Sequence, residues 1–200
     1  MKYDRLIRSL EKNRYVVSYF EEAEEAIKYL EQEIQGVTVG FGDSETLSAL
    51  NLQQMLAKRN TVIDPSTSTK NTFVEVGKKT LTTEVFLTSV NGVAETGEMV
   101  NIDGTGNRVA GSIFGHRKVY FIFGTNKVEP TLNRAVSRAR NIAAPKNAKR
   151  LGLKTPCAVK GDRCYQCNSE DRICNTMNIH LKKMSNTWAE VVIINKPLGL

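Results

Sequence analysis

Four cysteines carry the most specific chemistry of this sequence, because all of them fall within eighteen residues. They are Cys157, Cys164, Cys167 and Cys174. The middle two have CxxC spacing, a short loop that directs two sulfurs to one metal. The residues between the cysteines are mostly polar or glycine, which turn easily and cannot form a core. Four thiols at this density predict a closed metal site, held by a Cys-rich insertion over residues 155–176.

The spacing leaves the occupant of this metal site open. Zinc ribbons normally use two CxxC pairs, whereas this segment has one. Iron–sulfur clusters tolerate more varied spacing, so a 4Fe-4S cluster is favoured over structural zinc. Disulfides or free thiols are the third alternative, although structural disulfides are not expected in a reducing compartment. A closed site without a redox partner would be structural, so ligation alone does not predict electron transfer.

A second candidate site is the glycine-rich segment 90–108. It follows a strongly apolar run and precedes a short predicted helix, yet most of its residues are polar or glycine. This density suits a backbone that wraps a polar ligand, with Arg108 as a fork for a carboxylate or phosphate. The plain alternative is a hairpin turn at Thr96 and Gly97 and a loop at Asp103 and Gly104. The candidate ligand residues are Asn91, Gly97, Asn101, Gly104, Thr105, Gly106, Asn107 and Arg108.

Two further segments are expected at the same end of the sheet. Residues 40–46 (GFGDSET) are predicted to be a strand end, a tight turn and a helix start. In open α/β sheets, ligands bind at the carboxyl ends of the strands. The candidates in this segment are Gly40, Gly42, Ser44 and Thr46, and the alternative is an ordinary capped turn. Lys127 follows another predicted strand, where it could neutralise an anion.

These motifs resemble one family, and the resemblance covers essentially the whole chain. The runs AETGE at 94–98 and NIDGTGNRVA at 101–110 are similar to those of the LUD (lactate-utilization) domain, as are AKRLGLKTPC at 148–157 and DRICN at 171–175. The resemblance implies a fold similar to the group of glucosamine-6-phosphate isomerase, ribose-5-phosphate isomerase and CoA-transferase, whose glycine-rich loops bind phosphosugars or thioesters. It also implies a part in the oxidation of lactate to pyruvate, beside iron–sulfur partner subunits.

The catalytic residues are less well defined than the ligand loop. Related isomerases carry an acidic residue soon after the equivalent strand, where this chain has Asn91. An asparagine cannot take up a proton, so an isomerase mechanism would use Glu95, Glu98 or Asp103. Whether the chain is an enzyme therefore stays open.

The elements that must position these residues alternate between strands and helices. The predicted strands are 15–20, 37–41, 61–64, 85–90, 119–124 and 191–194, and the predicted helices are 23–34, 47–56, 108–114 and 132–143. The last helix is expected to end before Pro145. The runs at 85–90 and 119–124 are nearly continuously apolar, which is typical of strands in a parallel sheet. The sequence therefore predicts one α/β domain over residues 1–200, with a mainly parallel sheet and helices on both faces.

Composition and charge narrow the class of protein. No apolar stretch approaches the roughly 20 residues of a membrane span, and the charged start MKYDR is unlike a signal peptide. We therefore expect a cytoplasmic protein. The net charge is +7, and residues 134–154 carry seven cations and no acid. We expect this stretch to be mainly a solvated helix face and linker, and a patch for a small anionic ligand is the next alternative. Nucleic-acid binding is the least favoured alternative, because the interleaved aromatic residues expected for RNA are missing.

Two main hypotheses for function follow. The first is an enzyme, or enzyme subunit, of lactate or related organic-acid metabolism, with an anionic small molecule at residues 97–108 and a cluster at the cysteines. The second is a non-catalytic sensor or assembly subunit whose cysteines hold a structural zinc. The sequence does not decide whether the chain forms homo-oligomers.

Overall fold

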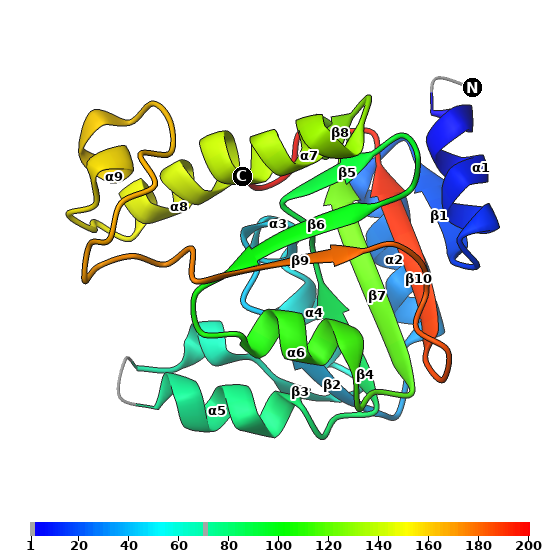
Figure 1. Ribbon diagram of the computed structural model, residues 1–200. Helices are drawn as coiled ribbons and strands as arrows, with labels where there is room; N and C mark the ends of the chain where they lie inside the picture. The colour runs from blue at the N-terminus through cyan, green and yellow to red at the C-terminus, as the bar shows by residue number, and fades with distance from the viewer. Residues whose placement is uncertain (1–2, 70–71) are drawn as a thin grey trace.

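A six-stranded sheet runs through the centre of the computed structural model, which describes residues 3–69 and 72–200 (Figure 1). In spatial order its strands are β1 (Val16–Phe20), β10 (Trp188–Ile194), β7 (Lys118–Gly124), β4 (Val85–Thr88), β2 (Thr38–Phe41) and β3 (Thr61–Ile63). Every neighbouring pair is parallel. The predicted mainly parallel α/β fold is therefore confirmed. The first two residues of the charged start, on which the expectation of no signal peptide partly rests, lie outside the described residues.

Helices pack on both faces of this sheet. The helices that precede the glycine-rich segment are α1 (Asp4–Lys12), α2 (Ala23–Glu33), α3 (Glu45–Ala49), α4 (Leu52–Ala57) and α5 (Phe73–Thr80). On one face, Leu30 of α2 and Leu56 of α4 share a buried cluster with Tyr120 of the central strand β7. On the other face, Leu6 and Leu10 of α1 belong to a second buried cluster. The alternating side chains of the strands supply both clusters.

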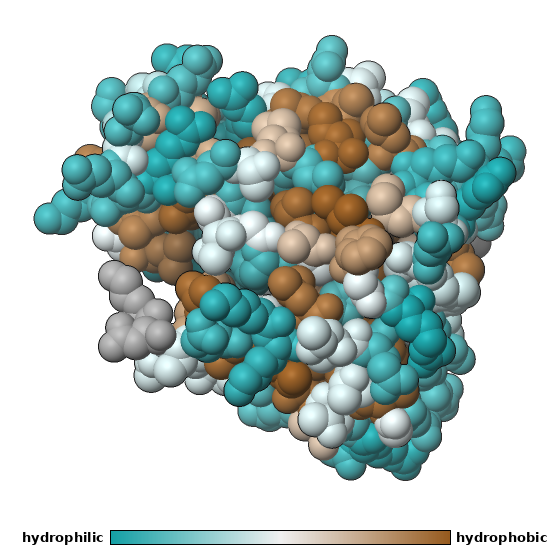
Figure 2. Space-filling model, turned by 60° about the horizontal axis from the view of Figure 1, so that its bottom comes forward, coloured by the Kyte–Doolittle hydropathy of each residue, from teal (hydrophilic) through white to brown (hydrophobic). Residues whose placement is uncertain are grey.

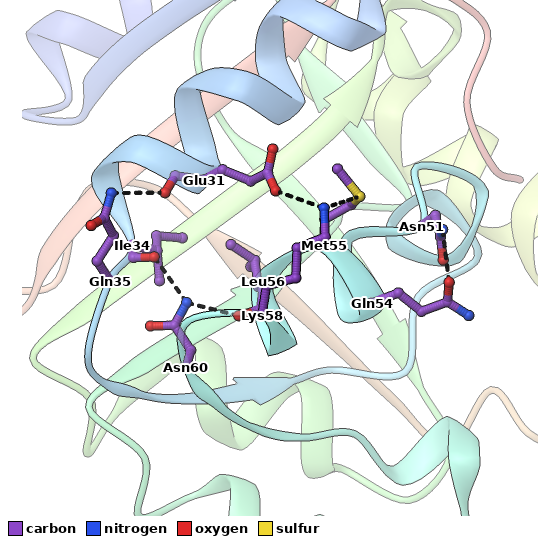
Figure 3. A network of polar contacts seen from close by, with 9 residues as sticks. All are labelled: Glu31, Ile34, Gln35, Asn51, Gln54, Met55, Leu56, Lys58 and Asn60. Atoms are coloured by element: carbon purple, nitrogen blue, oxygen red, sulfur yellow. Dashed lines mark hydrogen bonds and ion pairs between the residues drawn. The ribbon is translucent and has the colours of Figure 1, made fainter.

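Polar contacts fix α4 and the turn after it against the end of α2 (Figure 3). Nζ of Lys58 lies 3.4 Å from Oε1 of Glu31. Nδ2 of Asn60 donates to the backbone carbonyls of Ile34 and Leu56, each at 2.9 Å. Carbonyls in the last turn of a helix lack a partner within the helix. Asn60 therefore satisfies the ends of both helices with one side chain.

The glycine-rich segment is largely a β-hairpin, which corrects the expectation of a loop wrapped around a ligand. Its strands are β5 (Gly92–Ala94) and β6 (Met99–Asp103), and β8 (Val128–Glu129) and β9 (Thr176–His180) complete a four-stranded sheet in the order β8-β5-β6-β9. Gly97 lies in the hairpin turn with φ of +96°, a conformation that favours glycine. The turn at Thr96 and Gly97 that the plain alternative predicted is present, and the ligand contacts predicted for the rest of the segment stay a prediction.

The helix predicted to end before Pro145 instead continues through it. The chain runs through α7 (Leu132–Arg138), a π-helical turn (Ala139–Ala143) and α8 (Ala144–Arg150), which form one long rod in Figure 1. Proline lacks an N–H and clashes with the carbonyl four residues earlier. A π turn changes that spacing locally, so the rod continues towards α9 (Pro156–Lys160) and the cysteines.

The helix predicted over residues 47–56 also differs from expectation. It is broken into α3 and α4, because Asn51 takes the left-handed conformation with φ of +52°. Ser44 precedes α3 as expected, but its side chain makes no capping hydrogen bond.

Gly111, in α6 (Asn107–Ile113), gives a test of the packing between this helix and the sheet. A Cβ at this position would lie 2.5 Å from Cζ of Phe86 and 2.8 Å from both Cε atoms, and Phe86 is fully buried. We expect Gly111→Ala to destabilise the protein by about 1–3 kcal/mol in urea unfolding. The matched control is Gly77→Ala in α5, where the nearest atom would be 3.7 Å away. That control should gain about 0.5–1 kcal/mol from helix propensity. Equal effects of the two variants would contradict this packing.

The surface on the side of α5 and α6 is mixed. Figure 2 shows hydrophobic residues there in several patches separated by hydrophilic ones. Exposed large hydrophobic residues include Val74 of α5 and Phe114, directly after α6. Among the described residues, no helix combines the length and the hydropathy that crossing a membrane requires.

Candidate functional site

The order of the strands marks one place in the main sheet as special. From β2 the chain passes outward to β3, and then returns to β4 on the other side of β2. Ligands in open parallel sheets bind outside the carboxyl ends of the strands at such a reversal. A cavity of about 540 Å³ lies here, and we call it the switch-point cavity. The segment from Gly42 to Thr46 lines it after β2, Ser89 and Asn91 line it after β4, and Lys127 lines it after β7.

Arg108, in the first turn of α6, supplies one positive charge to this cavity. Its Nη2 donates to Oδ1 of Asn91 at 3.3 Å and to the backbone carbonyl of Ile102. Oδ1 of Asn91 also accepts from the backbone N–H of Ile102 at 2.8 Å. Asn91 therefore positions a guanidinium. The remaining donors of that guanidinium are the natural partners of a carboxylate or phosphate.

Lys127 supplies a second positive charge, and its side chain is only 3% exposed. Its Nζ donates to Oγ1 of Thr46 at 2.8 Å and to Oγ of Ser89 at 3.1 Å. Burial, followed by the charges of Arg138 and Arg108, lowers the pKa of Lys127 to about 7. The hydroxyls satisfy the donors of this amine without neutralising its charge.

A third cation, Arg138, is buried behind the wall of the cavity. Its guanidinium donates to the backbone carbonyls of Asn91, Asn126 and Leu200. It comes from the basic stretch 134–154, which was expected to be a solvated face and linker. That expectation holds for Arg140, Lys146, Lys149, Arg150 and Lys154, which are exposed, but Arg138 is 5% exposed.

The three cations form no ion pair with an acidic side chain in the described residues, although Asp103 and Asp43 act on Arg108, and Glu129 on Arg138, from farther away. Within the part of the chain that the structure describes, no Asp or Glu side chain lies within 4 Å of Arg108, Lys127 or Arg138. Taking a charge out of water costs several kcal/mol unless a partner compensates it. Because Asp43, Glu45 and Asp103 also line the cavity, the part of it that suits an anion is the part beside Arg108 and Lys127.

Most of the predicted ligand residues meet in this cavity, although they come from distant segments. Those that line it are Gly42, Ser44, Thr46, Asn91, Gly104, Thr105, Asn107, Arg108 and Lys127. Gly42 allows close approach, since a Cβ there would lie 3.1 Å from Cγ of Arg108. Of the catalytic candidates, Asp103 lines the cavity, and its carboxylate accepts from the backbone N–H groups of Gly104 and Val109.

The other predicted site residues lie outside the cavity. Glu95 and Glu98 belong to the hairpin turn with Gly97, where Glu95 pairs with Arg5 at 3.2 Å. Asn101 is fully buried in β6, and neither of its amide atoms has a hydrogen-bond partner. The remaining two, Gly40 and Gly106, are also absent from the lining.

Several lining residues were not predicted from the sequence. They include Asp43, Glu45, Phe73, Ser89, Asn147 and Arg150. Ser89 had a usable signal, because it belongs to the predicted strand 85–90 near its carboxyl end. Asn147 and Arg150 had none, since they belong to the helix that was expected to end before Pro145. Arg150 pairs with Glu45 at 3.1 Å.

All four cysteines line a second cavity of about 170 Å³, which we call the cysteine cavity. Each is partly buried and none forms a disulfide. The backbone N–H of Gln166 donates to Sγ of Cys164 at 3.4 Å, and Oγ1 of Thr155 lies 3.3 Å from Sγ of Cys157. Among residues 3–69 and 72–200, no three His, Cys, Asp or Glu side chains form a group that could hold a metal ion. The thiols thus surround a space, and a metal there stays a prediction.

The two cavities are neighbours. Ile102, Ala144 and Ile173 line both of them. The rod of α7 and α8 reaches from one to the other, because Asn147 faces the switch-point cavity and Pro145 lines the cysteine cavity. A ligand in the first cavity would therefore lie one layer of side chains from the thiols.

A serine–histidine pair elsewhere belongs to the packed interior. Oγ of Ser112 lies 3.1 Å from Nε2 of His180, and both residues are almost fully buried. Burial lowers the pKa of His180 to about 4, so its imidazole is neutral at pH 7. Neither residue lines the switch-point cavity or the cysteine cavity.

Comparison with known proteins places this geometry in a family. The model of the LUD domain matches residues 3–194. A solved structure, a DUF162 family protein from Deinococcus radiodurans, superposes with a TM-score of 0.55 at 10% sequence identity, over 97% of this chain and 99% of that one. That likeness shows the fold. A search of the curated proteins found no match. Because the family model spans almost the whole chain, the protein belongs to the LUD domain family, which is associated with lactate utilization.

Proposed function

We propose that the protein binds a small organic anion in the switch-point cavity and acts in the use of lactate or a related organic acid. The observation that carries this proposal is a set of three cations, Lys127 and Arg138 buried and Arg108 partly buried, with no Asp or Glu side chain within 4 Å in the described residues. An anionic ligand would supply the missing charge. Family membership supports the organic-acid class.

The size of the cavity bears on the ligand. At about 540 Å³ it falls within the range of roughly 300–1,000 Å³ typical of sites for drug-sized ligands. A three-carbon acid would fill a small part of this space. We therefore infer that the site takes a larger organic acid, or a small acid beside a second molecule. A role in the oxidation of lactate to pyruvate, and kinship to the isomerase and CoA-transferase group, stay predictions.

The test of anion binding is a thermal-shift titration with lactate, pyruvate, larger hydroxy and oxo acids, and inorganic phosphate. We expect Arg108→Ala to weaken the binding of an acid that stabilises the wild type by about thirtyfold or more, because truncating a buried charged partner costs about 2–5 kcal/mol. Arg108→Lys keeps the charge but loses the fork, so its affinity should fall in between.

The matched control for this titration is Arg8→Ala, whose side chain is 79% exposed on α1. It should bind as the wild type does. If no acid or phosphate in the panel shifts the melting temperature of the wild type, or if Arg108→Ala responds like Arg8→Ala, anion binding in this cavity is wrong.

We further propose that Cys157, Cys164, Cys167 and Cys174 hold a 4Fe-4S cluster in the cysteine cavity. Four thiols are the usual ligand set of such a cluster, and here all four line one cavity. The single CxxC pair also differs from the two pairs of a usual zinc ribbon. Bound there, a cluster would supply one-electron transfer, and iron–sulfur partner subunits would be its natural exchange partners.

The alternative is a non-catalytic sensor or assembly subunit with a structural zinc. One observation counts against acid–base catalysis by the three predicted carboxylates, although Asp43, whose pKa burial raises, and Glu45 also line the cavity. Glu95 and Glu98 lie outside the cavity, and Asp103 holds two backbone N–H groups. A carboxylate fixed in this way is better placed to shape the loop than to move protons.

A further inference from the structure

Lys127 differs from an ordinary anion-binding lysine in what surrounds its amine. Nζ has two hydroxyl partners, on Thr46 and Ser89, at 2.8 and 3.1 Å. Among the described residues no acidic side chain lies within 4 Å of it. The side chain is 3% exposed, yet it lines the switch-point cavity. Lys127 therefore lines the cavity with its amine held in place by two hydroxyls and not neutralised by an ion pair.

This setting keeps much of the amine in its free form. Burial and the charges of Arg138 and Arg108 lower the pKa of Lys127 to about 7. A much larger share of the Lys127 amine is then unprotonated at neutral pH than for an exposed lysine, whose pKa is about 10.4. A desolvated lysine beside other cations is a nucleophile for carbonyl carbon.

The rest of the cavity supplies what such a nucleophile needs. Arg108 presents guanidinium donors to the anionic group of a ligand, held in place by Asn91. The hydroxyls of Thr46 and Ser89 lie within hydrogen-bond reach of Nζ, where they can pass protons between the amine and a carbonyl oxygen. A ligand that uses both features carries a carbonyl group and an acid group in one molecule.

We propose that the switch-point cavity captures an oxo acid covalently on Lys127. Nζ adds to the carbonyl carbon, so a C–N bond forms. The carbonyl oxygen takes up the two protons of the amine and leaves as water when the C–O bond breaks, and an imine of the oxo acid remains. No oxidant or reductant is consumed. This inference rests on the proposed function, because the anionic group of the oxo acid occupies the same cationic site.

The test is reductive trapping at pH 7 with sodium borohydride, in the presence of pyruvate, 2-oxoglutarate or phenylpyruvate. Borohydride reduces the C=N bond to a stable secondary amine, and the protein gains the mass of one reduced acid unit. Peptide mapping should place the adduct on Lys127, at a level at least about tenfold above any exposed lysine, given its larger free-amine fraction. Lactate has no carbonyl group and should give no adduct.

Two variants make the trapping result specific. Lys127→Arg keeps a cation in the cavity but cannot form an imine, so it should abolish the adduct. Lys79→Arg changes an exposed lysine of α5 and should trap as the wild type does. The thermal shift with the same acids is recorded in parallel. An absent adduct with all three acids, or one spread over exposed lysines, overturns covalent capture. If the thermal shifts persist in that case, non-covalent anion binding still stands, and if they vanish too, both proposals fall.

Discussion

Lys127→Met should stabilise the protein at pH 6 and at the same time abolish its binding of organic anions. The folded protein holds Lys127 with its pKa lowered to about 7, mainly through burial, whereas an unfolded lysine has a pKa of about 10.4. Between these two values the unfolded chain binds the proton and the folded chain releases it. The free energy of unfolding therefore rises with pH across this window. Below pH 7 both states are protonated, and the full cost of the buried charge is present.

The size of the gain follows from replacing a buried charge by an apolar side chain. Such replacements stabilise proteins by about 1–4 kcal/mol, and we expect about 2 kcal/mol at pH 6 for Lys127→Met. At pH 10 the gain should vanish or reverse, because the neutral amine then keeps its two hydroxyl partners at little electrostatic cost. Urea unfolding at both pH values measures the difference.

The control for this stability measurement is Lys79→Met, an exposed lysine on α5. Its effect on the free energy of unfolding should be small and similar at both pH values. A loss of stability at pH 6 in Lys127→Met would mean that the amine is needed for folding. That outcome would contradict the hypothesis that the buried charge of Lys127 lowers stability and is kept for ligand binding.

The parts of the site that were predictable from sequence are those that follow directly from the apolar strands and from where these strands end. The apolar runs ending near Ser89 and Gly124 are buried strands, and parallel strands present their carboxyl ends at one edge. That rule alone brings Asn91 and Lys127 to the same edge, where the structure places them. Thr46 and Arg108 follow from the turn after β2 and the helix start after β6.

The parts that were not predictable depend on contacts between distant segments. Thr46 and Lys127 are 81 residues apart in sequence. They form a hydrogen bond because β2, β4 and β7 lie side by side in the sheet, which brings the segments after β2 and β7 together. No local pattern fixes that order of strands. The same holds for Arg138, which a run of basic residues suggested would be solvated. Its neighbours Arg134 and Arg140 are exposed, and only helix packing turns Arg138 inward.

The glycine-rich segment shows how one pattern can serve two purposes. Its glycines suggested a ligand loop, but Gly97 forms a hairpin turn against α1, and Gly92 packs against the backbone of Ala135. Both ends of the segment reach the cavity, Val90 and Asn91 at its start and residues 102–108 without Gly106 at its end, whereas the hairpin turn between them does not. Glycine is favoured both where a backbone must come close to a neighbour and where φ is positive. The number of glycines in a segment therefore does not show whether the neighbour is a ligand or another helix.

The cysteine cavity gives the second large prediction, which concerns metal content. Protein purified without oxygen should contain about four irons per chain, with a broad absorption band near 400 nm that bleaches on reduction. Cys164→Ser should remove essentially all of this iron. It should also make residues 155–176 sensitive to proteolysis. A segment with so few apolar residues depends on the free energy of metal binding to stay folded.

Arg172 distinguishes a built metal site from loosely held thiols. It donates to the backbone carbonyls of Cys167 and Cys174, at 2.9 and 3.1 Å, and so ties the two ends of the last ligand loop together. Groups that orient ligands in this way are worth about 10–100-fold in metal affinity, so Arg172→Ala should lose iron to a chelator faster than the wild type. Asn168→Ala, an exposed residue of the same loop, is the matched control and should retain its iron. If the purified protein is colourless and contains one zinc per chain, the cysteines hold a structural zinc and not a cluster. If the purified wild type contains no metal and is only as stable as Cys164→Ser, the cysteines do not form a metal site. The switch-point cavity would then be the functional centre.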